Sequence, residues 1–274
     1  MCWADIDAHS TKDAVLAALR RTGLALFYAS EGLKDDKEVV LAAMQQNHGA
    51  LKYASEKLKN DKDFLVLTAL PQHGRALEYL SKELKNDKEV VLAAVQQNGS
   101  ALEYASKRLK DDEELALAAV QQDGFALEHA SQELTDDKDF VLAALRQNGY
   151  ALQYASEGLR GDKDCVLAAV RQNGRALYYA SEKLKNDKEL VLAALQRSRG
   201  GALSYGSEES KNDKEVVLAA PRQGHGSTLC YASEELKNDM EVLLAALEME
   251  LKTTSATTFT TTFTTTLGRS GDTP

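Results

Sequence analysis

Cysteine and proline are scarce in this sequence, with three of each among 274 residues. The cysteines Cys2, Cys165 and Cys230 are odd in number, lie far apart and form no CxxC pair, which excludes a disulfide framework. No apolar run approaches the roughly 20 residues that a membrane-spanning helix needs. The first residues, MCWADIDAHSTK, lack the basic start and apolar stretch of a secretory signal. We therefore expect a cytoplasmic protein, with export by a non-classical route left open.

A strong excess of one charge is also missing. The net charge of −9 is spread thinly, because acidic and basic residues alternate along the chain. There is no basic stripe that would suit a phosphate backbone, so we expect no nucleic-acid partner and no membrane partner. Glycine-rich phosphate loops, an HExxH spacing and a distinctive carboxylate pair are absent too. The sequence thus predicts no enzyme, no metal site and no cofactor.

The chain is instead dominated by a repeat. A unit of 25 residues, for example DKEVVLAAVQQNGSALEYASKRLKD at 87–111, recurs nine times from residue 11 and ends halfway through a tenth. A period in this range is typical of solenoids and related arrays. Three units hold one extra residue, which we place near the turn in the middle of the unit. The units begin at Thr11, Asp36, Asp61, Asp87, Asp112, Asp137, Asp162, Asp187, Asp213 and Asp239.

Each unit predicts two helices joined by a turn. In the unit that begins at Asp87, this aspartate is a candidate N-cap for a helix of about ten residues. Asn98-Gly99 ends that helix, with Gly99 suited to a left-handed conformation. The first helix is apolar on nearly every side, which indicates burial on nearly every side. A second, outer helix with one apolar face is predicted from about residue 100 to residue 110.

The sequence therefore predicts an all-α solenoid, a superhelical array of about nine helix-turn-helix repeats that we expect to be monomeric. The array occupies residues 11–252, and its final half-unit is expected to be a C-terminal cap with a wet outer face. Residues 1–10 form an N-terminal cap segment in which Trp3 covers the first core. Residues 253–274 form a threonine-rich tail for which we expect disorder, with a glycosylated stalk or a β-aggregating segment as alternatives.

The late repeats depart from the pattern. Ser210 replaces a leucine, Gly206 replaces an alanine, and Pro221 stands inside a first helix, where proline costs about 3 kcal/mol. These changes predict that residues 200–235 are the weakest part of the array.

An aromatic residue recurs in the middle of each predicted second helix, at the edge of its buried face. Two interpretations remain open. The side chain is either a half-buried packing residue with a wet hydroxyl, or part of a stripe that lines a groove for a peptide. These residues, referred to below as the aromatic row, are Tyr28, Tyr53, Tyr79, Tyr104, His129, Tyr154, Tyr179, Tyr205 and Tyr231.

Serine recurs two positions after each member of the aromatic row. A serine in mid-helix is expected to bond back to a carbonyl one turn earlier, or across a close helix contact. A lysine follows one turn later in most repeats, but an exposed, protonated lysine is a poor base for a nucleophile. Phosphorylation is a weaker alternative. The serine row is Ser30, Ser55, Ser81, Ser106, Ser131, Ser156, Ser181, Ser207 and Ser233.

The aspartates that begin the repeats are interpreted as N-caps. Carboxylates one repeat apart start roughly 10 Å from each other, which is too far to share one metal ion. The histidines form no paired spacing, and the three near mid-unit turns are expected to be exposed loop residues. The histidines are His9, His48, His73, His129 and His225.

The pairing of D-K-E/D before an apolar run with N-G-x-A-L-x-Y-A-S after it resembles the repeats grouped as domain of unknown function 4116. The resemblance covers residues 11–252, and Ser210 and Pro221 depart from it. It implies tandem short helical units of the kind seen in bacteria, including intracellular pathogens, and in protists and algae. The family carries no assigned catalytic residues, so none is transferred.

Three functions remain open at this stage. The first is a non-enzymatic scaffold that binds protein or peptide partners along one face, with the aromatic row as its candidate binding site. The second, which the resemblance motivates, is an effector-type module that acts in a host cell. The third is a product of repeat expansion without a specific activity, which the near-identical repeats and the threonine tract would fit.

Overall fold

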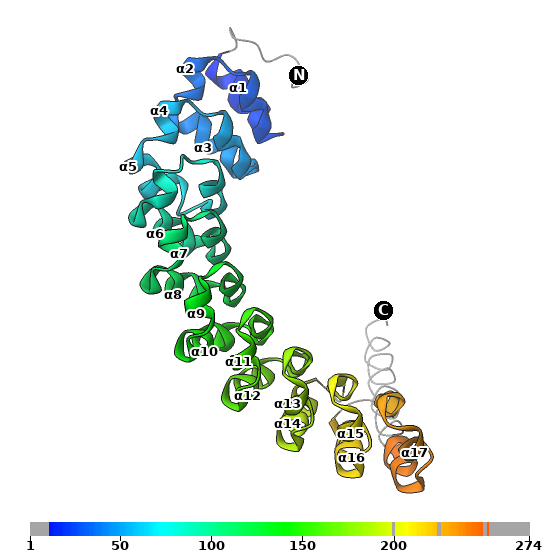
Figure 1. The fold of residues 1–274 in the computed structure, drawn as a ribbon. Helices are drawn as coiled ribbons and strands as arrows, with labels where there is room; N and C mark the ends of the chain where they lie inside the picture. Colours follow the sequence, from blue (N-terminus) through cyan, green and yellow to red (C-terminus); the bar gives the residue numbers. More distant parts are fainter. Residues whose placement is uncertain (1–10, 199–200, 224–225, 249–250, 252–274) are drawn as a thin grey trace, which may run out of the picture. The chain divides into compact units, whose positions relative to one another are not determined.

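The computed structural model is helical throughout its regular structure, and no strand occurs in the residues that it describes (Figure 1). This confirms the predicted all-α repeat fold. The segment 1–10 with Trp3 and the tail 253–274 lie outside the described residues, so the expectations for them stay predictions. The described residues are 11–198, 201–223, 226–248 and 251.

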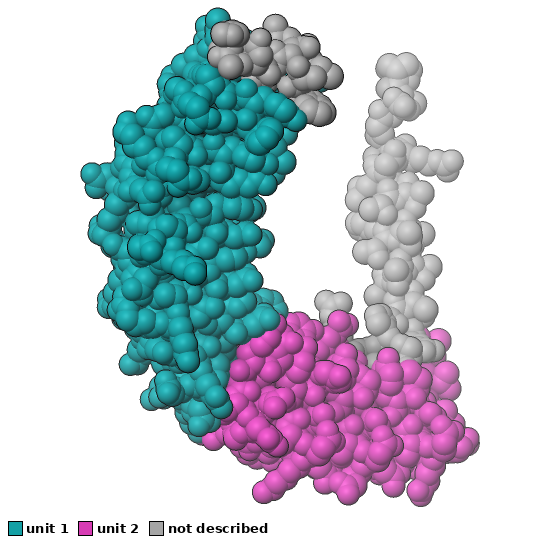
Figure 2. All heavy atoms as spheres, turned by 45° about the horizontal axis from the view of Figure 1, so that its top comes forward, with its two compact units in different colours: residues 1–147 teal, residues 148–274 magenta. Residues whose placement is uncertain are grey.

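The chain divides into two compact units, residues 1–147 and residues 148–274 (Figure 2). Within each unit, the elements of one repeat pack on those of the next repeat along the chain. The two units are built from the same elements and are taken separately below.

Each repeat starts with a longer helix. In α6, the Asp87 side chain accepts hydrogen bonds from the backbone N–H groups of Glu89 and Val90, which confirms the predicted N-cap. Residues 240–248 form the corresponding helix of the last half-repeat. The first helices are α1 (Lys12–Leu19), α3 (Lys37–Gln46), α5 (Lys62–Phe64), α6 (Lys88–Gln97), α8 (Glu113–Gln122) and α10 (Lys138–Gln147) in unit 1, and α12 (Lys163–Gln172), α14 (Lys188–Ser198) and α16 (Lys214–Gln223) in unit 2.

The predicted single outer helix is wrong. After the first helix the chain forms a 3-10 helix, then breaks at Ala105, whose backbone is extended at φ −64° and ψ 155°. The 3-10 helices are η2 (Gly23–Tyr28), η3 (His48–Tyr53), η5 (Gly74–Tyr79), η7 (Gly99–Tyr104) and η8 (Gly124–His129) in unit 1, and η9 (Gly149–Tyr154), η10 (Gly174–Tyr179), η11 (Gly201–Tyr205) and η12 (Gly226–Tyr231) in unit 2.

A short third helix completes each repeat. It begins after the serine of the serine row and has a single turn. These helices are α2 (Glu31–Lys34), α4 (Glu56–Lys59), the 3-10 turn η6 (Leu84–Asn86), α7 (Lys107–Lys110) and α9 (Gln132–Thr135) in unit 1, and α11 (Glu157–Arg160), α13 (Glu182–Lys185), α15 (Glu208–Lys211) and α17 (Glu234–Lys237) in unit 2.

Gly99 is required by a close approach to the next repeat rather than by the left-handed conformation that we predicted. A Cβ atom at Gly99 would lie 2.3 Å from the backbone oxygen of Ala119, and Gly99 shows no positive φ. Its N–H donates to Oε1 of Gln122 at 2.6 Å. Asn98 has an extended backbone, and its side chain caps the 3-10 helix by accepting from Ser100. The glycine thus marks the point where two repeats touch.

The core lies between the first helix and the 3-10 helix. In the repeat that begins at Asp87, Val91, Val95 and Leu102 are completely buried. Leu92 and Ala93 on the other side of α6 are only half-buried. The prediction that the first helix is buried on nearly every side is therefore wrong, because its neighbours cover one face and not the whole circumference.

The extra residue of the third repeat lies inside the first helix and not at the mid-unit turn. α5 continues into a single π-helical turn, η4 (Leu65–Ala69), in which the Leu70 N–H donates to the Leu65 oxygen. A π-turn absorbs one residue without ending the helix. The positions that we predicted for the other two insertions fall in segments 199–200 and 224–225, outside the described residues.

The wet outer face predicted for the last helix was based on Glu248, which is exposed, and on Glu250 and Lys252, which lie outside the described residues, so it stays a prediction. The described part of this helix also exposes large apolar side chains. Met240, Leu244 and Leu247 are 70%, 53% and 54% exposed. Position 247 corresponds to Val95, which the following repeat buries completely. No helix in the described part of the chain is long and apolar enough to cross a membrane.

Candidate functional site

Each residue of the aromatic row is the last residue of a 3-10 helix, and not a mid-helix residue of an outer α-helix as predicted. The side chains are half-buried in most repeats, and Tyr28 and Tyr231 are 41% and 44% exposed. A tyrosine of this kind presents part of its ring and its hydroxyl at the surface. Both interpretations of the row, packing and binding, remain compatible with this placement.

The aromatic row contacts the preceding repeat through side chains that vary along the chain. In unit 1, the ring of Phe27 meets that of Tyr53 edge-on at 5.2 Å, and Arg75 donates to the Tyr104 hydroxyl at 3.3 Å. In unit 2, Tyr178 meets Tyr205 in the same edge-on manner at 5.6 Å. The rows of unit 1 and of unit 2 thus each make contacts between neighbouring repeats, and the chemistry of these contacts differs from one repeat to the next.

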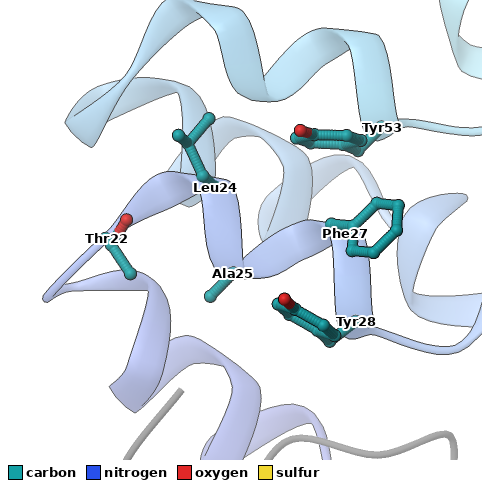
Figure 3. A pocket seen from close by; sticks show the side chains of 6 residues that line it. All are labelled: Thr22, Leu24, Ala25, Phe27, Tyr28 and Tyr53. Carbon is teal, nitrogen blue, oxygen red and sulfur yellow. The ribbon is translucent and has the colours of Figure 1, made fainter. Parts of the chain in front are cut away.

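A pocket of mixed polarity lies between the first two repeats, beside Tyr28 and Tyr53 of the row. The pocket has a volume of about 280 Å³ and is lined by Thr22, Leu24, Ala25, Phe27, Tyr28 and Tyr53. Figure 3 shows the Phe27 ring between those of Tyr28 and Tyr53, with both tyrosine hydroxyls on the side where Leu24 and Ala25 lie. Leu24 and Phe27 are 40% and 53% exposed. Large apolar side chains at the surface around a pocket are the usual features of an interaction site.

The serine row holds neighbouring repeats together, which corrects the interpretation as mid-helix serines. The Ser106 N–H donates to the Lys85 oxygen at 2.9 Å, and its hydroxyl donates to Asn86 Oδ1 at 2.6 Å. The same hydroxyl oxygen caps α7 by accepting from the Leu109 N–H at 3.4 Å. These bonds give the serine a structural role, and they occupy the groups that a nucleophile would need.

The aspartates that begin the repeats have a second role that sequence reasoning missed. Besides capping its helix, Asp87 pairs with Lys62 of the preceding repeat at 2.8 Å, and Lys62 also reaches Glu89 at 2.8 Å. The recurrence of D-K-E every 25 residues was the available signal. The lysine of one repeat follows its cap and points to the cap of the next repeat. The same joint occurs at Asp36, Asp61 and Asp112 in unit 1, and at Asp187, Asp213 and Asp239 in unit 2.

One joint in unit 1 lacks its lysine. Glu113 occupies the position of Lys88, while Asp137 still caps α10 by accepting from the Phe140 N–H at 2.8 Å. We expect Glu113→Lys to raise the stability of unit 1 by about 1 kcal/mol, because it replaces a like-charge approach by an ion pair. Urea denaturation of the variant and of Glu113→Gln measures this. Equal gains for lysine and glutamine would show that the ion pair contributes nothing.

These ion pairs also predict an acid limit to stability. The hydrogen bond from Lys62 lowers the pKa of Asp87, and that from Lys88 lowers the pKa of Asp112. A carboxyl group with a lowered folded-state pKa adds stability that is complete above its unfolded pKa of about 3.9 and is lost as the pH falls through the folded pKa. The contribution of these joints should therefore change little between about pH 7 and pH 5 and be lost below about pH 4. Burial lowers the pKa of His73 and of His129, so any loss of melting temperature that begins near pH 6.5 belongs to these histidines and not to the joints.

The control for this prediction is a pair of lysine variants. Lys62→Met removes a joint lysine, whereas Lys183→Met removes an exposed lysine of α13 outside the joints. The acid fall should be shallower in the first variant than in the second. A fall of equal steepness in both variants would assign the acid sensitivity to other groups.

The histidines are less exposed than we predicted. His48 and His73 are half-buried, and together with Gln72, Gly74, Arg75, Gln97 and Asn98 they line a small polar pocket of about 170 Å³. Burial lowers the pKa of His73, and nearby His48 lowers it further. Nε2 of His73 is buried without a hydrogen-bond partner. His9 and His225 lie outside the described residues.

The described residues hold no group of three or more His, Cys, Asp or Glu side chains that could bind a metal ion. Cys165 is buried and Cys230 is exposed.

One family model matches the chain repeatedly, under the description Domain of unknown function (DUF4116). It matches residues 11–59, 36–66, 65–110, 112–160 and 162–211, which together cover well over half of the chain. No curated protein and no solved structure matches the chain significantly.

Proposed function

Because this chain belongs to the family defined by the DUF4116 domain, and its repeats form a helical scaffold, we propose that it binds a protein or peptide partner along the surface of its 3-10 helices, without enzymatic activity. The family description assigns no function. The proposal therefore depends on which positions of the repeat keep the same residue throughout the chain and which positions vary.

The variable positions on the 3-10 helix support the proposal. Glycine, alanine and leucine recur at fixed positions of the 3-10 helices because they touch the next repeat or fill the core, as Gly99 and Leu102 of η7 do. Two other positions change freely between repeats, the one after the glycine and the one before the aromatic row. They lie three residues apart, and residues i and i+3 eclipse on a 3-10 helix, so they share one face. Examples are Leu24 with Phe27 and Arg75 with Glu78 in unit 1, and Arg175 with Tyr178 in unit 2.

A surface on a constant framework with variable side chains is what partner recognition uses, because the framework fixes positions and the exposed side chains set the chemistry. Passive repeat expansion gives no reason for the apolar side chains of Leu24 and Phe27 to stay 40% and 53% exposed to water. This observation favours the binding scaffold over expansion without activity.

The test is affinity capture from cells of the source with wild type and with a variant that carries Phe27→Ala, Tyr53→Ala and Tyr79→Ala. We expect the variant to lose the partners that wild type recovers. Leu67→Ala is the matched control, because Leu67 is an apolar residue that is 76% exposed on a first helix, away from the 3-10 helices. Identical partners for all three proteins would reject this binding surface. Thermal melts check that each variant is folded.

A further inference from the structure

The chemistry of the proposed binding surface differs between the first repeat and the later repeats of unit 1. The pocket of about 280 Å³ between the first two repeats has Phe27 and Leu24 exposed at its edge. The position of Phe27 is taken in the following repeats by Lys52, Glu78, Glu103 and Glu128, all of which are exposed. The surface therefore begins with exposed apolar side chains and continues with a row of carboxylates.

The carboxylates are only partly balanced by their neighbours. Arg75 lies beside Glu78 and Glu103 and donates to the Tyr104 hydroxyl at 3.3 Å. Among the variable positions of η5, η7 and η8, one positive charge stands against three carboxylates. Lys52 lies close enough to act on Glu78, and Lys107 and Lys110 line a pocket together with Glu128. The variable positions themselves therefore carry more negative than positive charge. A partner segment that lies along them gains from positive charge, and a negative segment is repelled.

The spacing of the repeats selects an extended partner. Consecutive 3-10 helices of unit 1 pack directly on one another, and packed helices are about 8–10 Å apart. A polyproline-II segment turns once every three residues and advances about 9 Å per turn. Every third side chain of such a segment therefore faces the surface once per repeat. Two turns of an α-helix advance about 10.8 Å, so a helical partner would drift from the repeats by about 1–3 Å at each step.

We infer, on the basis of the proposed function, that the partner is an extended peptide with one bulky apolar residue in the pocket at Phe27 and basic residues at every third position facing Glu78, Glu103 and Glu128. Glu78 lies two repeats beyond Phe27, so the basic residues begin about six residues from the apolar anchor. The residue opposite Lys52 is polar or acidic.

The experiment measures fluorescence anisotropy with synthetic peptides and the full chain. The lysine peptide has phenylalanine at one end and lysine at every third position from the seventh onward, and it is made in both chain directions. The glutamate peptide has glutamate at the same positions, and a third peptide has serine in place of phenylalanine. We expect the lysine peptide in its better direction to bind about 10-fold or more tightly than either of the other two.

Variants of the protein locate the binding. Phe27→Ala should weaken the lysine peptide about 10-fold at all salt concentrations, because it removes the apolar anchor site. Glu103→Lys with Glu128→Lys should reverse the preference between the lysine and glutamate peptides, and rising salt should reduce this effect. Glu235→Lys is the charge-matched control, since Glu235 is exposed on α17 in unit 2.

Three results would overturn the inference. The first is equal binding of the lysine and glutamate peptides. The second is that the control substitution Glu235→Lys abolishes the preference for the lysine peptide to the same extent as the double substitution of Glu103 and Glu128. The third is binding that appears only in a Trp3→Ala variant, which would assign the pocket to the N-terminal segment of the chain itself.

A selection from a random-peptide library separates a failure of this inference from a failure of the proposed function. Binders that depend on Phe27 but lack the basic spacing overturn the inference alone, whereas the absence of any binder that depends on Phe27 or Tyr53 overturns both.

Discussion

Replacing Gly99 by alanine is expected to destabilise the joint between the repeats at Asp87 and Asp112 by about 3 kcal/mol or more. The added Cβ would lie 2.3 Å from the Ala119 oxygen and 3.0 Å from the Asp123 nitrogen, both of which are backbone atoms. Backbone cannot rotate away as a side chain can, so η7 has to move off α8. That movement would also break the bond from Gly99 to Gln122.

Gly32→Ala is the matched control for this substitution. Nothing lies within 4 Å of a Cβ atom at Gly32, which is exposed in the short helix α2. Alanine there should stabilise the protein by about 0.5–1 kcal/mol, because it favours the helix and restricts the unfolded chain. Urea denaturation gives the size of both effects, and amide exchange locates the loss at η7 and α8. If Gly99→Ala proved as harmless as Gly32→Ala, the close approach would not be a constraint.

The second large effect concerns a buried position where two repeats carry different residues. Leu109 in α7 is completely buried, and Ser210 occupies the equivalent site in α15 at 3% exposure. Leu109→Ser should cost about 3–4 kcal/mol, because it leaves a cavity and brings a hydroxyl into an apolar site. Ser210→Leu should restore part of this energy in unit 2, a gain of about 1–2 kcal/mol.

The gain is smaller than the loss because Ser210 is already accommodated. Its hydroxyl donates to the Lys185 oxygen at 3.0 Å and lies 3.3 Å from the Ser207 hydroxyl. Gly206 occupies the position that Ala105 has in the repeat of Leu109, and a Cβ atom there would lie 3.3 Å from the Ser210 Cβ. Urea denaturation with Ser210→Ala as the intermediate variant measures the two contributions. A net loss for Ser210→Leu would show that the site has closed around the serine.

The Ser210→Leu variant also tests the prediction that residues 200–235 are the weakest part of the array, when it is studied by amide exchange. α16 runs from Lys214 to Gln223 and thus includes position 221, where the sequence has proline. Amide exchange that is faster in α15 and α16 than in α12 would support the prediction, and Ser210→Leu should slow it in α15.

The sequence was sufficient for the features that depend on residues close together in the chain. Asp87 precedes helix-forming residues, and its capping bonds reach only three residues ahead, so the start of the first helix was predictable. The break at Ala105 was not. Residues 100–110 favour a helix throughout, but Ser106 bonds to Lys85 and Asn86 of the preceding repeat, and those bonds require an extended backbone at Ala105.

The candidate site was predictable to the same limited degree. The aromatic row was visible as a recurring residue, but several of its rings contact a variable residue of the repeat before, as Tyr53 contacts Phe27 and Tyr205 contacts Tyr178. Such a contact depends on how two repeats stack, which a pattern within one repeat does not contain. The pocket at Phe27 was missed for this reason, although two adjacent aromatic residues at positions 27 and 28 were a usable signal.

The joints also bear on how an array of this kind changes in length. Each joint links a residue to partners about one repeat away, as Lys62 is linked to Asp87 and Ser106 to Asn86. An in-frame duplication or deletion of one whole repeat therefore recreates every joint from residues already encoded. A change of a few codons instead has to be absorbed inside one repeat, as the π-turn at Leu65–Ala69 absorbs a single residue. Gene rearrangements in steps of one repeat are thus the ones that the fold tolerates at least cost, and each step would lengthen or shorten the surface that a partner could contact.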